Sequence, residues 1–187
     1  MEVPFKPGWI GEIPSEYLDE NFKKILLFYV VKCPRDKASS RGINIKEIWG
    51  NNVWGKRILR NKILEVGDLI PKENYLKVNK SDEISNAIAH IKLNGNFHTK
   101  LSGNKIVFCK NGEQEIINIL YYIRCSFAHG RFTIKKENNI KYYILEATKN
   151  RGKIELKSRM ILKESTLLDW IDIINNPKLY KDLWYLD

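Results

Sequence analysis

The chain has 187 residues, of which 43% are hydrophobic and 29% charged, a size and composition that suit one folded domain with a buried core. The formal net charge of +10 indicates a polyanionic partner, with nucleic acid the first expectation and an anionic membrane surface the second. The longest apolar run (25–31) is too short to span a bilayer and the first residues lack a signal-peptide pattern, so we expect a cytoplasmic protein with no membrane partner.

The first half of the chain predicts helices joined by polar loops. Residues 1–14, rich in proline and glycine, predict an extended arm. A helix is predicted from an N-cap at Ser15 to Pro34, because apolar residues recur there at helical spacing. Short helices are expected over 45–49 and 53–64, and a longer one from Ser81 to Gly95.

The second half predicts strands as well as helices. Residues 97–101 and 105–110 flank a Ser-Gly-Asn turn and predict a β-hairpin. A strong helix is expected from Gln114 to about Gly130, and a last helix from Ser165 to just before Pro177. Between them, three strands are predicted over 131–136, 141–147 and 153–162. The chain therefore predicts a single α+β domain spanning 1–187, with helices dominating its first two thirds and a strand-rich segment over 131–162.

The end of the helix predicted over 114–130 carries two residues suited to RNA cleavage, Arg124 and His129. Attack by a 2′-hydroxyl needs a base, an acid for the leaving 5′-oxygen and positive charge beside the phosphorane. Histidine can move protons near neutral pH, and arginine presents a planar fork of donors to phosphate oxygens. Residues five apart lie about 140° apart around a helix, so the two side chains converge only if the helix ends near His129, which Gly130 permits.

Residues 123–130, Ile-Arg-Cys-Ser-Phe-Ala-His-Gly, resemble the Arg-x4–6-His motif of the HEPN superfamily, whose members include toxin and antiviral-defence ribonucleases. The resemblance implies a mainly helical HEPN-like bundle, with the strands as β-hairpin or antiparallel elaborations, and a homodimer with the motif at its interface. It also implies a metal-independent endoribonuclease that leaves 2′,3′-cyclic phosphate and 5′-hydroxyl ends. Arg124 would bind the scissile phosphate and His129 would transfer protons. An antitoxin or an activating partner protein would then control the enzyme.

Further side chains are candidates for RNA contacts. Tyr122 would stack on an unpaired base, although aromatic residues at helical spacing more often pack in a core. Ser126 would help to position the site, because many family members have a polar residue, often Asn, where this chain has Cys125. Backbone phosphates would be contacted by basic residues on both sides of the motif: Lys56, Arg57, Arg60, Arg131 and Lys135. For the first three, a solvated helix face is the simpler interpretation.

The sequence leaves three functions open. The first is the endoribonuclease, and the second is a non-catalytic nucleic-acid-binding HEPN-like module or accessory subunit, which Cys125 favours. The third is a protein-interaction component whose basic charge serves an acidic protein. In the last two, Arg124 would form a salt bridge with Glu113 or Glu115, and His129 would cap its helix. Three scattered cysteines, with no nucleotide-binding or zinc-peptidase motif, predict no disulfide framework, metal or cofactor.

Overall fold

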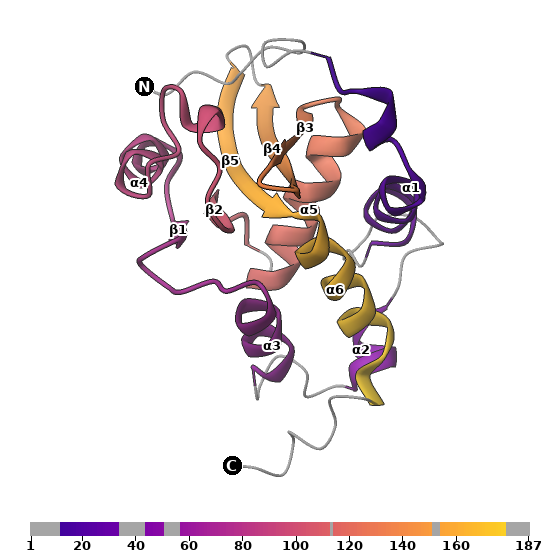
Figure 1. Ribbon diagram of the computed structural model, residues 1–187. Helices are drawn as coiled ribbons and strands as arrows, with labels where there is room; N and C mark the ends of the chain where they lie inside the picture. The colour runs from indigo at the N-terminus through magenta and orange to yellow at the C-terminus, as the bar shows by residue number, and fades with distance from the viewer. Residues whose placement is uncertain (1–11, 34–43, 51–56, 113, 151–153, 179–187) are drawn as a thin grey trace.

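The computed structural model describes residues 12–33, 44–50, 57–112, 114–150 and 154–178 (Figure 1). Within these ranges six α-helices are α1 (Glu20–Leu26), α2 (Ile45–Trp49), α3 (Ile58–Val66), α4 (Ile84–His90), α5 (Glu115–Ala128) and α6 (Glu164–Asn175). Five strands are β1 (Tyr75–Val78), β2 (Lys105–Cys109), β3 (Phe132–Glu137), β4 (Ile140–Asn150) and β5 (Ile154–Lys163).

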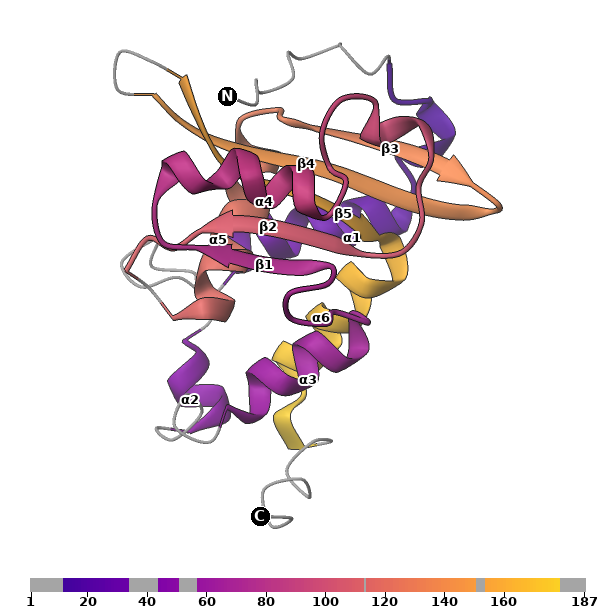
Figure 2. The same cartoon turned by 90° about the vertical axis from the view of Figure 1, so that its left-hand side faces the viewer.

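The five strands form one mixed sheet in the order β1-β2-β5-β4-β3. β1 and β2 run parallel, and all other neighbouring strands are antiparallel. α5 and α6 pack against one face of the sheet, with α1 and α3 against α6, whereas α4 packs against the other face (Figures 1 and 2). The sheet is therefore enclosed between two layers of helix.

This architecture corrects the expectation of a mainly helical HEPN-like bundle. The strands predicted over 131–136, 141–147 and 153–162 are confirmed as β3, β4 and β5, but they belong to the sheet around which the helices pack, with β3 at its edge. Residues 142–147 of β4 are buried without interruption. A strand shows such a continuous buried run when both faces of its sheet are covered. The chain is thus an α+β protein built around its sheet.

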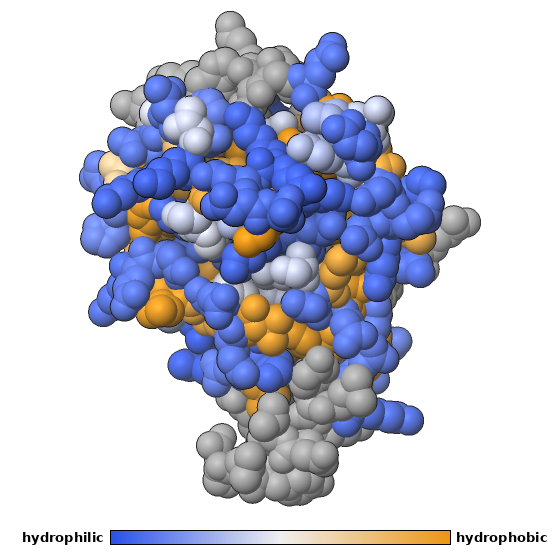
Figure 3. Space-filling view, in the orientation of Figure 1, coloured by the Kyte–Doolittle hydropathy of each residue, from blue (hydrophilic) through white to orange (hydrophobic). Residues whose placement is uncertain are grey.

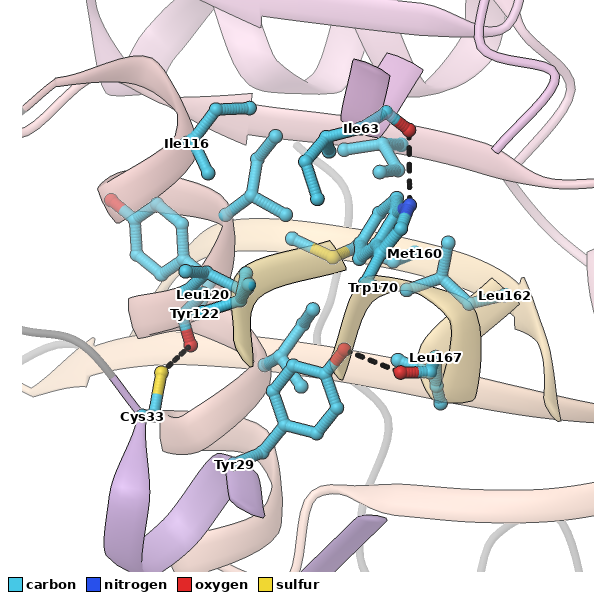
Figure 4. Close-up of a cluster of buried hydrophobic side chains, with 14 of the residues drawn as sticks. Tyr29, Cys33, Ile63, Ile116, Leu120, Tyr122, Met160, Leu162, Leu167 and Trp170 are labelled. Carbon is cyan, nitrogen blue, oxygen red and sulfur yellow. Dashed lines mark hydrogen bonds between the residues drawn. The ribbon is translucent and has the colours of Figure 1, made fainter. Parts of the chain in front are cut away.

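The larger of two hydrophobic cores lies between the sheet and the layer that contains α5 and α6 (Figure 4). Several of its buried polar atoms donate to backbone carbonyls, because buried polar groups need hydrogen-bond partners. The Tyr29 hydroxyl donates to the Leu167 carbonyl at 3.0 Å, and Trp170 Nε1 donates to the Ile63 carbonyl at 3.0 Å. These bonds join α6 to the N-terminal helical segment and to α3, so the helical layer is fixed by polar contacts as well as by apolar packing.

The second core lies under α4 and contains a buried ion pair between β4 and β5. Arg159 and Glu146 are both fully buried, and Arg159 Nε and Nη2 lie 2.6 and 2.5 Å from Glu146 Oε1. Arg159 Nη1 also donates to the Leu93 carbonyl at 2.7 Å, and its guanidinium carbon lies 4.7 Å from the centre of the Phe97 ring. The pair therefore ties the segment after α4 to the sheet.

The prediction of a β-hairpin over 97–110 is wrong. Residues Phe97–Thr99 form a 3-10 turn, and β2 pairs with β1 and β5 instead. Phe97 is buried against Arg159, and the Leu101 N–H donates to the Glu137 carboxylate at 2.5 Å. These contacts hold the segment on the face of the sheet, outside its hydrogen-bonded ladder. The parallel edge strand β1 was not predicted at all.

Most predicted helices are confirmed, with shifted ends. Asp19, not Ser15, caps α1, because its Oδ1 accepts from the Phe22 N–H at 3.1 Å. α1 continues into a π-helical segment, η2 (Leu27–Lys32), which stops before Pro34 as predicted. The helix predicted to reach Gly95 ends at His90. Residues 1–11 of the predicted arm and 53–56 of another predicted helix lie outside the described residues. No helix in the described part of the chain is long and apolar enough to cross a membrane.

Candidate functional site

The predicted motif lies at the C-terminal end of α5, and the helix ends as Gly130 led us to expect. His129 is the C-cap, and Gly130 has a φ of +61°, a conformation that glycine adopts readily. The Gly130 N–H donates to the Phe127 carbonyl at 3.2 Å, and the Arg131 N–H donates to the Ser126 carbonyl at 2.8 Å. This pair of bonds is a Schellman motif, which turns the chain directly from α5 into β3.

Arg124 is half-buried between α5 and η2. Its Nε donates to the Val30 carbonyl at 3.2 Å and so satisfies a carbonyl near the C-terminal end of η2. Among the described residues, its two terminal guanidinium nitrogens have no hydrogen-bond or ion-pair partner. The alternative salt bridge to Glu115 does not form, and Glu113 lies outside the described residues. Arg124 thus has a structural bond on one nitrogen and donors left over on two.

His129 is exposed, and helical geometry fixes its relation to Arg124. At about 100° per residue, Arg124 and His129 lie on opposite borders of an arc of about 140°. Tyr121, Cys125 and Ala128 lie between them, and all of this arc is at least partly exposed. We call these five residues the exposed strip of α5. The helix therefore presents both side chains on one partly exposed strip, whose Tyr121 and Cys125 also pack against the larger core, without bringing them together.

Two predicted contact residues lie in the core. Ser126 is 1% exposed and its hydroxyl donates to the Tyr122 carbonyl at 2.8 Å. Tyr122 is 4% exposed, its hydroxyl donates to the Cys109 carbonyl at 2.7 Å, and burial raises the pKa of that hydroxyl. Neither side chain is accessible to RNA. Their positions on α5 face the sheet, which the helical spacing alone did not reveal.

Most of the predicted basic contacts fall at the two ends of α5. Arg131 follows its C-terminus and is half-buried. Lys135 is half-buried on β3 and lies near His98, in the segment that covers the other face of the sheet. Arg57 and Arg60 lie at the start of α3, close to the N-terminus of α5. The 14 residues of α5 separate the two groups by about 21 Å along its axis. Lys56 lies outside the described residues.

At the N-terminal end of α5, Glu115 gathers three donors from other elements. Its carboxylate accepts from Arg60 Nε, Lys77 Nζ and the Tyr75 hydroxyl, each at 2.7 Å. Desolvation opposes ionisation of Glu115, but the hydrogen bonds from Lys77, Tyr75 and Arg60 outweigh it and hold the pKa of the carboxyl below its ordinary value. Lys77 was not predicted as a site residue, because only the parallel pairing of β1 brings it here.

Among the described residues, no group of three or more His, Cys, Asp or Glu side chains is placed to hold a metal ion. Cys33 and Cys109 are buried and Cys125 is half-buried, and none of the three forms a disulfide. The titratable and charged groups at the end of α5 are therefore the His129 imidazole, the Cys125 thiol and the guanidinium groups of Arg124 and Arg131.

In comparisons with known proteins, no family model, curated protein or solved structure matches the chain.

Proposed function

We propose that the protein is a cytoplasmic, metal-independent endoribonuclease of the toxin or antiviral-defence kind that acts through Arg124 and His129. The observation that carries the proposal is the exposed strip of α5, which presents an exposed imidazole and a guanidinium with two uncommitted nitrogens. Both belong to a chain of net charge +10, which favours RNA as the ligand.

In the proposed reaction the ribose 2′-oxygen attacks the adjacent phosphorus and the bond from phosphorus to the 5′-oxygen breaks. A neutral imidazole accepts the 2′-hydroxyl proton and a protonated one supplies a proton to the leaving 5′-oxygen. Arg124 stabilises the charge that develops on the phosphorane oxygens. The products are a 2′,3′-cyclic phosphate and a 5′-hydroxyl, so atoms and charge balance without another reactant.

A homodimer is part of this proposal, because one α5 holds Arg124 and His129 on opposite borders of its strip. If the strips of two copies face each other about a two-fold axis parallel to α5, Arg124 of one copy lies on the same side of the interface as His129 of the second. The residues between them, Tyr121, Cys125 and Ala128, would then form the contact. An antitoxin or activating protein would act on the same strip.

The test is cleavage of a labelled single-stranded RNA and of total RNA in EDTA by wild type, His129→Ala and His90→Ala. His90 is the matched control, because it is also exposed but lies on α4 at the other face of the sheet. We expect wild type and His90→Ala to cut equally, and His129→Ala to be slower by about 10²–10⁴-fold, the usual contribution of a proton-transfer group. Equal cleavage by all three proteins would refute the proposal.

A second candidate is a non-catalytic nucleic-acid-binding module. The bond from Arg124 Nε to the Val30 carbonyl favours it, because that bond explains the arginine without any chemistry. This candidate predicts salt-sensitive RNA binding by wild type and His129→Ala alike, with no cleavage at any pH.

A further inference from the structure

A basic groove lies at the opposite end of α5 from Arg124 and His129. Two adjoining hollows of about 280 and 190 Å³ share Lys77, Gln114 and Glu115 as lining residues. The first extends to Arg57 and Arg60, and the second extends to Lys110 and Gly112. Four cationic side chains and one carboxylate thus line what we call the cationic groove. They come from α3, β1, the start of α5 and the segment that joins β2 to α5.

The floor of the groove is fixed. Arg60 and Lys77 both bond to the Glu115 carboxylate, and the side chains of Arg60 and Glu115 are only 27% and 16% exposed. The hydroxyl of Tyr75, on β1, donates a third hydrogen bond to the same carboxylate. These bonds lock α3, β1 and α5 together, and they neutralise one of the two positive charges in the floor.

The sides of the groove carry cationic side chains that are not bonded to Glu115. Arg57 and Lys110 are exposed, and neither side chain has a hydrogen-bond or ion-pair partner among the described residues. They stand at the two outer ends of the combined hollows, one beside α3 and the other after β2. The face of the molecule seen in Figure 3 is largely hydrophilic, with hydrophobic patches among the hydrophilic residues. Two free cations beside a rigid, polar floor suit a ligand with repeated negative charges.

We propose that the cationic groove binds the phosphate backbone of RNA, with Arg57 and Lys110 each contacting a phosphate. The proposal rests on the proposed function only in taking RNA as the ligand. Contacts of this kind fix the position of a strand without reading its sequence. Because Glu115 in the groove is about 14 Å along α5 from Arg124 and about 21 Å from His129, the groove would hold a part of the RNA several nucleotides away from the cleaved bond.

The test is the salt dependence of binding to a labelled 2′-O-methyl oligouridylate, measured by fluorescence anisotropy. This probe has no free 2′-hydroxyl, so it cannot be cleaved by the proposed reaction and reports binding alone. The groove variant is Arg57→Gln/Lys110→Gln. The matched control is Lys92→Gln/Lys100→Gln, which removes two exposed charges from the segment that covers the other face of the sheet.

Loss of two phosphate contacts should reduce the slope of log K against log salt by about 1.4, at about 0.7 per contact on a single strand. Between about 50 and 200 mM salt, wild type should therefore lose about sevenfold more affinity than the groove variant. The control should keep the wild-type slope, and thermal unfolding should show that both variants fold. A groove variant with the wild-type slope, or a control with an equal reduction, would overturn the proposal. A reduced slope in a protein that cleaves no RNA would leave the groove standing and refute only the nuclease.

Discussion

Arg159→Met and Glu146→Gln each break a charge pair that is fully buried between β4, β5 and the segment after α4. Either change should lower the free energy of unfolding by about 3–5 kcal/mol, because it leaves a buried group without its counter-charge or donor. Arg159→Met should lower the free energy of unfolding more than Glu146→Gln, since it removes the donors to both the Glu146 carboxylate and the Leu93 carbonyl. For a chain of this size each kcal/mol corresponds to about 2–4 °C, so the melting temperature should fall by roughly 6–20 °C.

The double variant Glu146→Gln/Arg159→Met separates the contribution of the ion pair to stability from the destabilisation caused by an unpaired buried charge. It contains no buried charge at this position, so its destabilisation should be smaller than the sum of the single changes by at least about 1 kcal/mol. Urea denaturation followed by tryptophan fluorescence measures all three, because Trp49 and Trp170 are buried in the core. Glu155→Gln is the control, since it breaks the more exposed pair with Lys157 and should cost less than about 1 kcal/mol. A Glu146→Gln protein as stable as that control would refute the reasoning.

Two further predictions concern the end of α5 and the segment after α4. Gly130→Ala should lower the free energy of unfolding by about 1–2 kcal/mol, because alanine is strained at a φ of +61°. Gly130→Asn should lower it by less, since asparagine tolerates this conformation better. Equal melting temperatures for the two variants would contradict the prediction. Desolvation, with Lys135 and Arg159 nearby, lowers the pKa of His98 below its ordinary value of 6.5. The unfolded chain then binds more protons than the folded one just below pH 6.5, so the free energy of unfolding should be highest above that pH and fall as the pH drops toward the folded pKa. Unfolding curves of His98→Asn should lack this part of the pH dependence. A pH profile equal to that of wild type would contradict the prediction.

The helices were predictable because their apolar residues recur at helical spacing. β3, β4 and β5 were predictable because turn-forming residues separate the three runs in the sequence. The covered position of the sheet follows from burial that only the structure shows. Six consecutive residues of β4, 142–147, are buried, and a strand with one face in water would alternate instead. The expectation of a helical bundle came from a resemblance over residues 123–130, and a helix that packs on a sheet is compatible with that segment too.

The remaining differences depend on contacts between distant parts of the chain. β1 has only four residues and pairs in parallel with β2, so no turn marks it in the sequence. Lys77 and Arg60 meet at Glu115 because that pairing and the packing of α3 place them there. Tyr122 and Ser126 were assigned to RNA from their nearness to Arg124 in sequence, but which side of α5 faces the sheet is decided by tertiary packing.

The bond between Arg124 and the Val30 carbonyl determines how the proposed nuclease has to be tested. Loss of activity in Arg124→Ala alone would not identify a catalytic arginine, because the change also removes the donor that holds the end of η2 against α5. Arg124→Lys keeps a positive charge but loses the planar fork, and so does not separate the two roles either. His129 has no such complication, since its exposed side chain makes no hydrogen bond or ion pair among the described residues. Cleavage must therefore be judged first on His129→Ala. A defect in Arg124→Ala bears on the phosphate only if its melting temperature matches that of wild type.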